Sequence, residues 1–100
     1  MSNLRFNGFD WDKGNSTKNQ TKHGIEKAVI EAFFGGDPFV TEDPKHSQDE
    51  QRYLAVGLTK EGRFMLVSFT KRTKEGLQFV RPISARYMHD KEVKDYEKAD

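Results

Sequence analysis

The chain of 100 residues is long enough for one domain with its own core, and we expect residues 1–100 to form a single domain. It contains no cysteine, which excludes disulfides and thiolate metal sites, and its net charge of +1 does not by itself indicate a polyanionic partner. No stretch approaches the roughly 20 apolar residues of a transmembrane helix, and the start, MSNLRFNGFDWD, lacks a signal-peptide pattern, so we expect a cytoplasmic protein without membrane contact.

The first 36 residues predict a short strand and two helical segments. Residues 4–9 favour a strand that Gly8 weakens, and Asp12 is suited to cap a polar helix within residues 13–22, which must be short or partly loop. The clearest element is the helix in GIEKAVIEAFFGG. Its apolar stripe is Ile25, Ala28, Val29, Ala32 and Phe33. Gly35 and Gly36, which tolerate positive φ, and the following Pro38 should end this helix.

Residues 39–42 favour a short strand, and three longer strands are predicted over residues 52–59, 63–72 and 77–86. The short turns KEGR and TKEG make these three an antiparallel meander. The second strand should be central, because residues 64–67 are apolar on both faces. Pro82 lacks an N–H group, so the third strand should lie at an edge or contain a bulge, which leaves open the face that Arg86 takes.

Residues 89–100 predict a C-terminal helix with a thin apolar stripe, Val93 and Tyr96. We therefore expect an α+β fold. Its antiparallel β-sheet should consist of a meander of three strands plus one or two shorter N-terminal strands, packed with N-terminal helices and the C-terminal helix.

Charge is distributed unevenly. Residues 37–50 hold five acidic residues against one lysine, and residues 60–86 hold seven basic residues against two glutamates. A basic sheet face can attract a polyanion, because lysine and arginine neutralise phosphates. The alternative is a solvated sheet edge on which lysines prevent aggregation.

The candidate chemical groups are histidines and cations. No two of the three histidines have metal-ligand spacing, and the chain has no glycine-rich phosphate loop, serine elbow or cysteine nucleophile, so we expect neither a metal nor a cofactor. What remains is His23 beside Lys22, His46 in an acidic loop, and arginines on the predicted strands.

This set suits RNA cleavage by its own 2′-hydroxyl, which needs a base, an acid and cations that stabilise charge on the phosphate. Each residue also has a structural alternative. His23 can cap a helix, His46 can hydrogen-bond within a turn, and an arginine can simply pair with a nearby Glu42, Asp43 or Glu50.

Four blocks in the chain resemble BrnT-type toxins. The first, FDWDKGNSTKNQTKHGI, has the family's aromatic-acid-Trp-Asp opening and its Lys-His-Gly-Ile end. The second, EDPKHSQDEQRYLAVG, has the Asp-Pro-basic-His-Ser and Glu-x-Arg pattern. The third is FTKR, and the fourth is ISAR with Glu92, Tyr96 and Glu97. Pro82 departs from the family pattern, which commonly has isoleucine there.

The resemblance implies a RelE-like ribonuclease toxin of a type II toxin–antitoxin pair, which inhibits translation by metal-independent RNA cleavage. It also implies neutralisation by a small ribbon-helix-helix antitoxin of the BrnA kind, and contact with operator DNA only through that complex. The alternative is a degenerate, non-catalytic module that binds the antitoxin and contributes to operon autorepression. Direct DNA binding is disfavoured because no helix-turn-helix pattern is present.

On this resemblance we assign the site residues. His23 is the favoured proton-transfer residue, and Glu50 and Arg52 should enter the cleft with His46 near its rim. Phosphate would be positioned by Lys22, Arg52, Arg72 and Arg86. Further RNA contacts are assigned to Arg63, Lys71, Arg81 and Trp11, although Trp11 is also suited to pack under the helix. The alternative for Glu50 and Arg52 is an ion pair that only fixes the loop.

Overall fold

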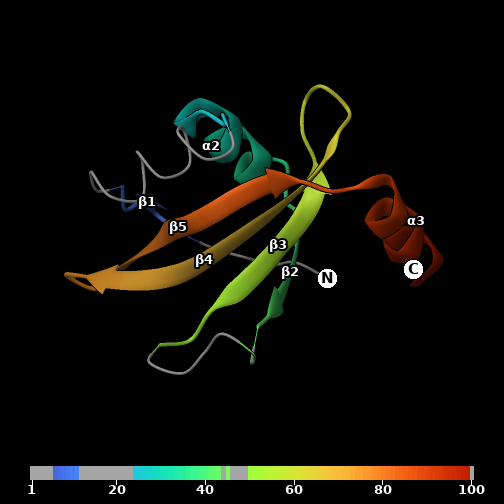
Figure 1. Cartoon of the computed structure of the whole chain (residues 1–100). Coiled ribbons are helices and arrows are strands. Elements are labelled where there is room, and N and C mark those ends of the chain that lie inside the picture. Colours follow the sequence, from blue (N-terminus) through green and yellow to red (C-terminus); the bar gives the residue numbers. More distant parts are fainter. Residues whose placement is uncertain (1–5, 12–23, 44, 46–49, 100) are drawn as a thin grey trace.

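The computed structural model describes residues 6–11, 24–43, 45 and 50–99. These ranges contain two helices and five strands, in the order β1 (Gly8–Phe9), α2 (Lys27–Gly35), β2 (Phe39–Glu42), β3 (Tyr53–Leu58), β4 (Phe64–Lys74), β5 (Leu77–Tyr87) and α3 (Asp90–Ala99). The predicted α+β fold is confirmed (Figure 1). The predicted polar helix in residues 13–22 and its cap Asp12 lie outside the described residues. Neither α2 nor α3 is long enough to span a bilayer.

The five strands form one sheet in the order β1-β5-β4-β3-β2, which confirms the meander and the central place of β4. The sheet is nevertheless mixed, because β1 runs parallel to β5, with Gly8 opposite Phe79 and Phe9 opposite Val80. The predicted antiparallel arrangement therefore holds for β2 to β5 and is corrected only at β1. A two-residue strand gives no pattern from which its direction could be predicted.

β5 is an interior strand with a bulge opposite β4. Ser84 pairs with Ser68 and Pro82 pairs with Phe69, which leaves Ile83 as the extra residue. The bulge that Pro82 predicted is present, and the alternative of an edge strand is excluded because β1 flanks β5. The turn between β4 and β5 is tight, because Glu75 and Gly76 have φ of 53° and 80°, the two positive values of a type I′ hairpin.

α2 covers one face of the sheet. Its buried residues Ile30, Phe33 and Phe34 follow i, i+3 and i+4, and the Phe34 ring lies 5.2 Å from that of Phe69, centroid to centroid. The predicted stripe is wrong in part, because Ala28 is exposed.

α2 ends at the two predicted glycines, but neither of them has the positive φ that was expected. Gly35 is the last helical residue and Gly36 has φ of −88°, whereas the positive φ of 58° falls on Asp37. The residue with positive φ after α2 is therefore Asp37, one position beyond the two glycines and directly before Pro38.

We call the side of the sheet against α2 the near face and the opposite side the far face. Along β4, Met65, Val67 and Phe69 are fully buried in the core with α2, so the alternating residues between them belong to the far face. α3 lies at one end of the sheet beyond β5 (Figure 1), where Tyr96 packs 5.7 Å from Phe64 between ring centroids. The far face carries most of the predicted arginines.

Candidate functional site

Arginines gather on the far face around the middle of β4. Arg81 of β5 pairs with Thr70 of β4, and Arg72 lies two residues further along β4 on the same face. β3 pairs Tyr53 with Phe69, and continuing this ladder by one residue places Arg52 on the other side of Thr70. The Asp43 N–H donates to the Arg52 carbonyl oxygen at 2.9 Å, so the ladder between β2 and β3 also continues to Arg52.

Arg52, Thr70 and Arg81 thus form one row across three strands, with Arg72 diagonal to it. Adjacent strands lie about 4.8 Å apart and diagonal residues about 7–8 Å apart, so the three arginines start from backbone positions within roughly 10 Å of one another. We call Arg52, Arg72, Arg81 and Thr70 the far-face cluster. Guanidinium groups are always charged and can hold two phosphate oxygens at once, so this cluster is suited to an oxyanion.

Carboxylates already contact two members of the cluster. The Glu50 carboxylate is ion-paired and hydrogen-bonded with the Arg72 guanidinium. Asp10, which directly follows β1, lies 3.5 Å from Arg81 Nη1 and 3.2 Å from Lys74 Nζ. The Arg72 and Glu50 side chains are 37% and 38% exposed, and ion pairs at that exposure contribute only about 0–1 kcal/mol. An entering phosphate can therefore compete with Glu50.

Arg86 lies apart from the cluster, although it is on the same face. It pairs with Leu66, four residues along β4 from Thr70, which corresponds to about 13 Å. Both of its terminal nitrogens donate to Glu92 of α3 at 2.8 Å, and Glu92 also accepts the His89 N–H at 2.9 Å. The Arg86 hydrogen bonds, followed by that of His89, lower the pKa of Glu92 to about 2. The same pairing raises the pKa of Arg86.

Three of the residues assigned to RNA contacts lie on the other side of the sheet. Lys71 Nζ lies 4.6 Å from the Tyr53 ring centroid, and the Arg63 guanidinium lies 3.7 Å from that of Tyr87. Trp11 packs against the core beside α2 and donates its indole N–H to Glu31 at 2.9 Å. These residues do not join the far-face cluster, so contact of Lys71, Arg63 and Trp11 with RNA stays a prediction.

His23, Lys22 and His46 lie outside the described residues, so proton transfer by His23 also stays a prediction. Among the ranges described, no three histidine or acidic side chains come close enough together to hold a metal ion. Sequence reasoning assigned no role to Thr70 or Asp10. Both stand inside the family-like blocks FTKR and FDWD, which was the available signal.

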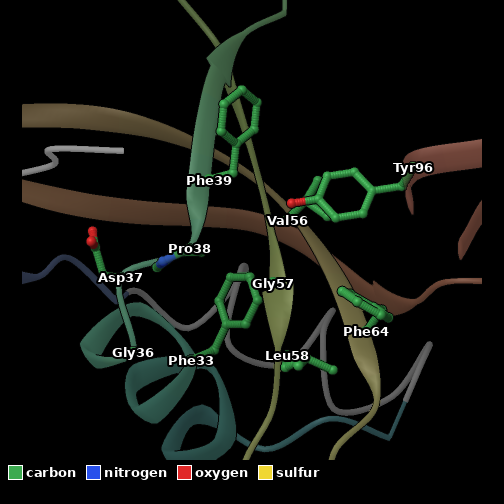
Figure 2. A pocket seen from close by; sticks show the side chains of 10 residues that line it. All are labelled: Phe33, Gly36, Asp37, Pro38, Phe39, Val56, Gly57, Leu58, Phe64 and Tyr96. Atoms are coloured by element: carbon green, nitrogen blue, oxygen red, sulfur yellow. The ribbon is translucent and has the colours of Figure 1, made fainter. Parts of the chain in front are cut away.

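A cavity of about 400 Å³ lies at the other edge of the sheet, between the start of β2, the end of β3 and α3 (Figure 2). Aromatic side chains of Phe33, Phe39, Phe64 and Tyr96 line it, and none of its ten lining residues is among the predicted site residues. Gly57 leaves room for Pro38 here, because a Cβ on it would lie only 3.1 Å from the Pro38 Cβ. This explains the glycine of the block RYLAVG in structural terms.

Comparison with known proteins agrees with the resemblance of the four blocks. The family model for BrnT, the ribonuclease toxin of type II toxin–antitoxin systems, matches residues 11–92. A search of curated proteins finds no match. The matched range runs from Trp11 to Glu92 and contains the whole far-face cluster and every predicted site residue. Because the match covers most of the chain, the chain belongs to the BrnT family of ribonuclease toxins of type II toxin–antitoxin systems.

Proposed function

We propose that this toxin cleaves the RNA backbone without a metal ion, and that the far-face cluster holds the scissile phosphate. The observation that supports this most directly is the row of Arg52 and Arg81 flanking Thr70, with Arg72 beside it. Cationic donors on one rigid sheet face are preorganised for the charge that develops on phosphorus.

In the proposed reaction the 2′-oxygen attacks phosphorus as the bond to the 5′-oxygen breaks. A base takes the 2′-hydroxyl proton and an acid protonates the leaving 5′-oxygen, which leaves a cyclic 2′,3′-phosphate and a 5′-hydroxyl. We assign proton transfer to His23, with Lys22 adding charge beside it. Glu50 enters this scheme through its ion pair with Arg72, because phosphate binding to Arg72 releases a carboxylate beside the reacting group.

Arg86 has a separate role in this proposal. Its distance of about 13 Å from Thr70 along the strands suits another phosphate of the RNA rather than the scissile one. It must first exchange Glu92 for that phosphate, since both of its terminal nitrogens are engaged.

Cleavage of a defined RNA in excess EDTA tests the proposal. We expect Arg72→Ala to lower the cleavage rate by roughly 100-fold, the cost of one lost oxyanion donor. Lys94→Ala, at an exposed position of α3, is the matched control for lost positive charge and should cleave like the parent. Equal rates for the parent, Arg72→Ala, Arg52→Ala and His23→Ala would exclude this assignment.

We further propose that a small ribbon-helix-helix antitoxin neutralises the toxin in the cytoplasm and that operator DNA is bound only through their complex. Membership of a type II toxin–antitoxin family supports an antitoxin partner. Expression of the toxin alone should arrest growth, and co-expression of the small open reading frame beside its gene should restore growth.

A non-catalytic module that only binds the antitoxin is the second candidate. The ion pairs of Arg72 with Glu50, Arg81 with Asp10 and Arg86 with Glu92 favour it, because they give these arginines a structural role. A chain that binds the antitoxin but neither arrests growth nor degrades RNA would support this candidate.

A further inference from the structure

Thr70 is a buried threonine whose hydroxyl makes no hydrogen bond. It lies in the middle of β4 with 1% of its surface exposed, and its Oγ1 has no hydrogen-bond partner. It is the one buried side-chain oxygen or nitrogen found in this condition within the described part of the chain. Thr59, the other buried threonine there, accepts the Arg63 N–H through its hydroxyl at 3.3 Å.

An unpaired buried hydroxyl destabilises a fold, because it loses its hydrogen bonds to water and gains none in return. Valine has nearly the same shape as threonine and favours strands equally, so packing alone gives no reason for a hydroxyl at this position. The hydroxyl therefore points to a partner outside the described structure.

The neighbours of Thr70 indicate what this partner is. Arg81 pairs with it, Arg72 lies two residues along β4, and continuing the β3–β4 ladder by one residue places Arg52 on its other side. Guanidinium groups donate hydrogen bonds and accept none, so the cluster brings many donors to the strand positions around Thr70, none of which bonds its hydroxyl. A tetrahedral oxyanion offers several acceptor oxygens at once and can pair with the guanidinium groups and the hydroxyl together.

We propose that Thr70 is a phosphate ligand, whose hydroxyl donates a hydrogen bond to a non-bridging oxygen of the RNA phosphate held by Arg52, Arg72 and Arg81. This inference rests on the proposed function, since it names a further contact within the same site. Because Thr70 is buried, entry of the phosphate requires the side chains that cover it to shift. The half-exposed pairing of Arg72 with Glu50 opposes that shift only weakly.

The test uses Thr70→Val, which removes the hydroxyl and keeps the shape, together with Thr70→Ser, which keeps the hydroxyl. Binding is measured by fluorescence anisotropy with a 2′-O-methyl oligoribonucleotide, which carries phosphates but cannot be cleaved. We expect Thr70→Val to bind the oligonucleotide at least about tenfold more weakly, since a hydrogen bond to a charged group is lost. Its rate of RNA cleavage should fall by at least the same factor. Thr70→Ser should retain most of the parent's affinity and cleavage rate.

Ser68→Ala is the matched control, because Ser68 lies two residues away on the same strand and face and pairs with Ser84. It should leave binding and cleavage unchanged. Thermal melting is measured first for every variant. Thr70→Val should melt no lower than the parent, and Thr70→Ala, which also lacks the hydroxyl, is used in its place if Thr70→Val does not fold.

Two outcomes separate this inference from the proposed function. If Arg72→Ala loses cleavage while Thr70→Val binds and cleaves like the parent, Thr70 is not a ligand and the proposed function stands. If the parent binds the oligonucleotide but does not cleave RNA, and Thr70→Val weakens that binding, the phosphate site stands and the nuclease proposal fails.

Discussion

The Glu50 carboxylate is ion-paired with the Arg72 guanidinium, which connects the segment before β3 to the central strand β4. The pair lies at the rim of the far-face cluster and is half exposed. The same contact can fix the segment in the free protein and be exchanged when a phosphate binds.

Glu50→Gln tests this exchange. We expect the variant to bind the uncleavable oligoribonucleotide several-fold more tightly at low salt, because Arg72 no longer has a competing carboxylate, and to cleave RNA more slowly. The gain in affinity should shrink in high salt, which screens exposed charges. Glu42→Gln removes the same charge from an exposed position on β2 and is the control. Equal affinities for Glu50→Gln and Glu42→Gln would mean that Glu50 does not compete for the site.

The pairing of Glu92 with Arg86 predicts a pH dependence of stability. The pKa of Glu92 is lowered from its usual 4.5 to about 2 in the folded protein. Its contribution to the free energy of unfolding is therefore fully present above pH 4.5 and is lost as the pH falls from 4.5 towards 2. We expect Glu92→Gln to melt below the parent at pH 7, with the difference disappearing near pH 2.

Glu97→Gln serves as the control for Glu92, because it removes the same charge from an exposed position on the same helix. Its melting temperature should depend on pH in the same way as that of the parent. A melting difference between Glu92→Gln and the parent that stays constant from pH 6 to pH 2 would contradict the assignment of the shift to Glu92.

Alanine substitutions at Gly57 and at Gly35 should change the free energy of unfolding in opposite directions. A Cβ at Gly57 would lie 3.1 Å from Pro38 Cβ and 3.3 Å from Pro38 Cα, so Gly57→Ala should destabilise the fold by about 1–3 kcal/mol. Gly35 is helical with open space around it, so Gly35→Ala should stabilise by about 0.5–1 kcal/mol. Urea titration measures both, and a neutral Gly57→Ala would show that the start of β2 can move.

Among the aromatic residues described, Phe34 of α2 should contribute most to the free energy of unfolding through its contact with the sheet. Phe34 is buried and its ring lies within 6.1 Å of those of Phe6, Phe9, Phe33 and Phe69, centroid to centroid. Phe34→Ala should lower the free energy of unfolding by about 3–5 kcal/mol. Phe39→Ala, at a side chain that is 43% exposed, should cost much less in the same urea titration. If Phe34→Ala and Phe39→Ala lowered the free energy of unfolding by similar amounts, Phe34 would not be at the centre of the core.

Much of the fold could be predicted because its signals are local. The apolar spacing in residues 25–34 predicted α2, and the turns KEGR and TKEG predicted the meander and the central place of β4. The rotation of α2 could not be predicted as well, since Ala28, Ile30 and Phe34 all suit an apolar stripe. Contact with Phe69 selects the side with Ile30 and Phe34.

The candidate site shows the same division. Arg81 and Arg86 are five residues apart, and regular alternation along a strand would place them on opposite faces. The extra residue at Ile83 restores a common face, so that Arg81 pairs with Thr70 and Arg86 with Leu66. Thr70 stands in the block FTKR, but nothing in the sequence shows that its hydroxyl is buried and unpaired.

By itself the sequence determined the family, the elements and the supply of cations, because these depend on residue type and on spacing over a few positions. Only the tertiary structure decided which arginines share a face and that Thr70 lies between them. These relationships depend on a bulge and on strand pairings between distant residues, and a one-residue change of register would reverse them.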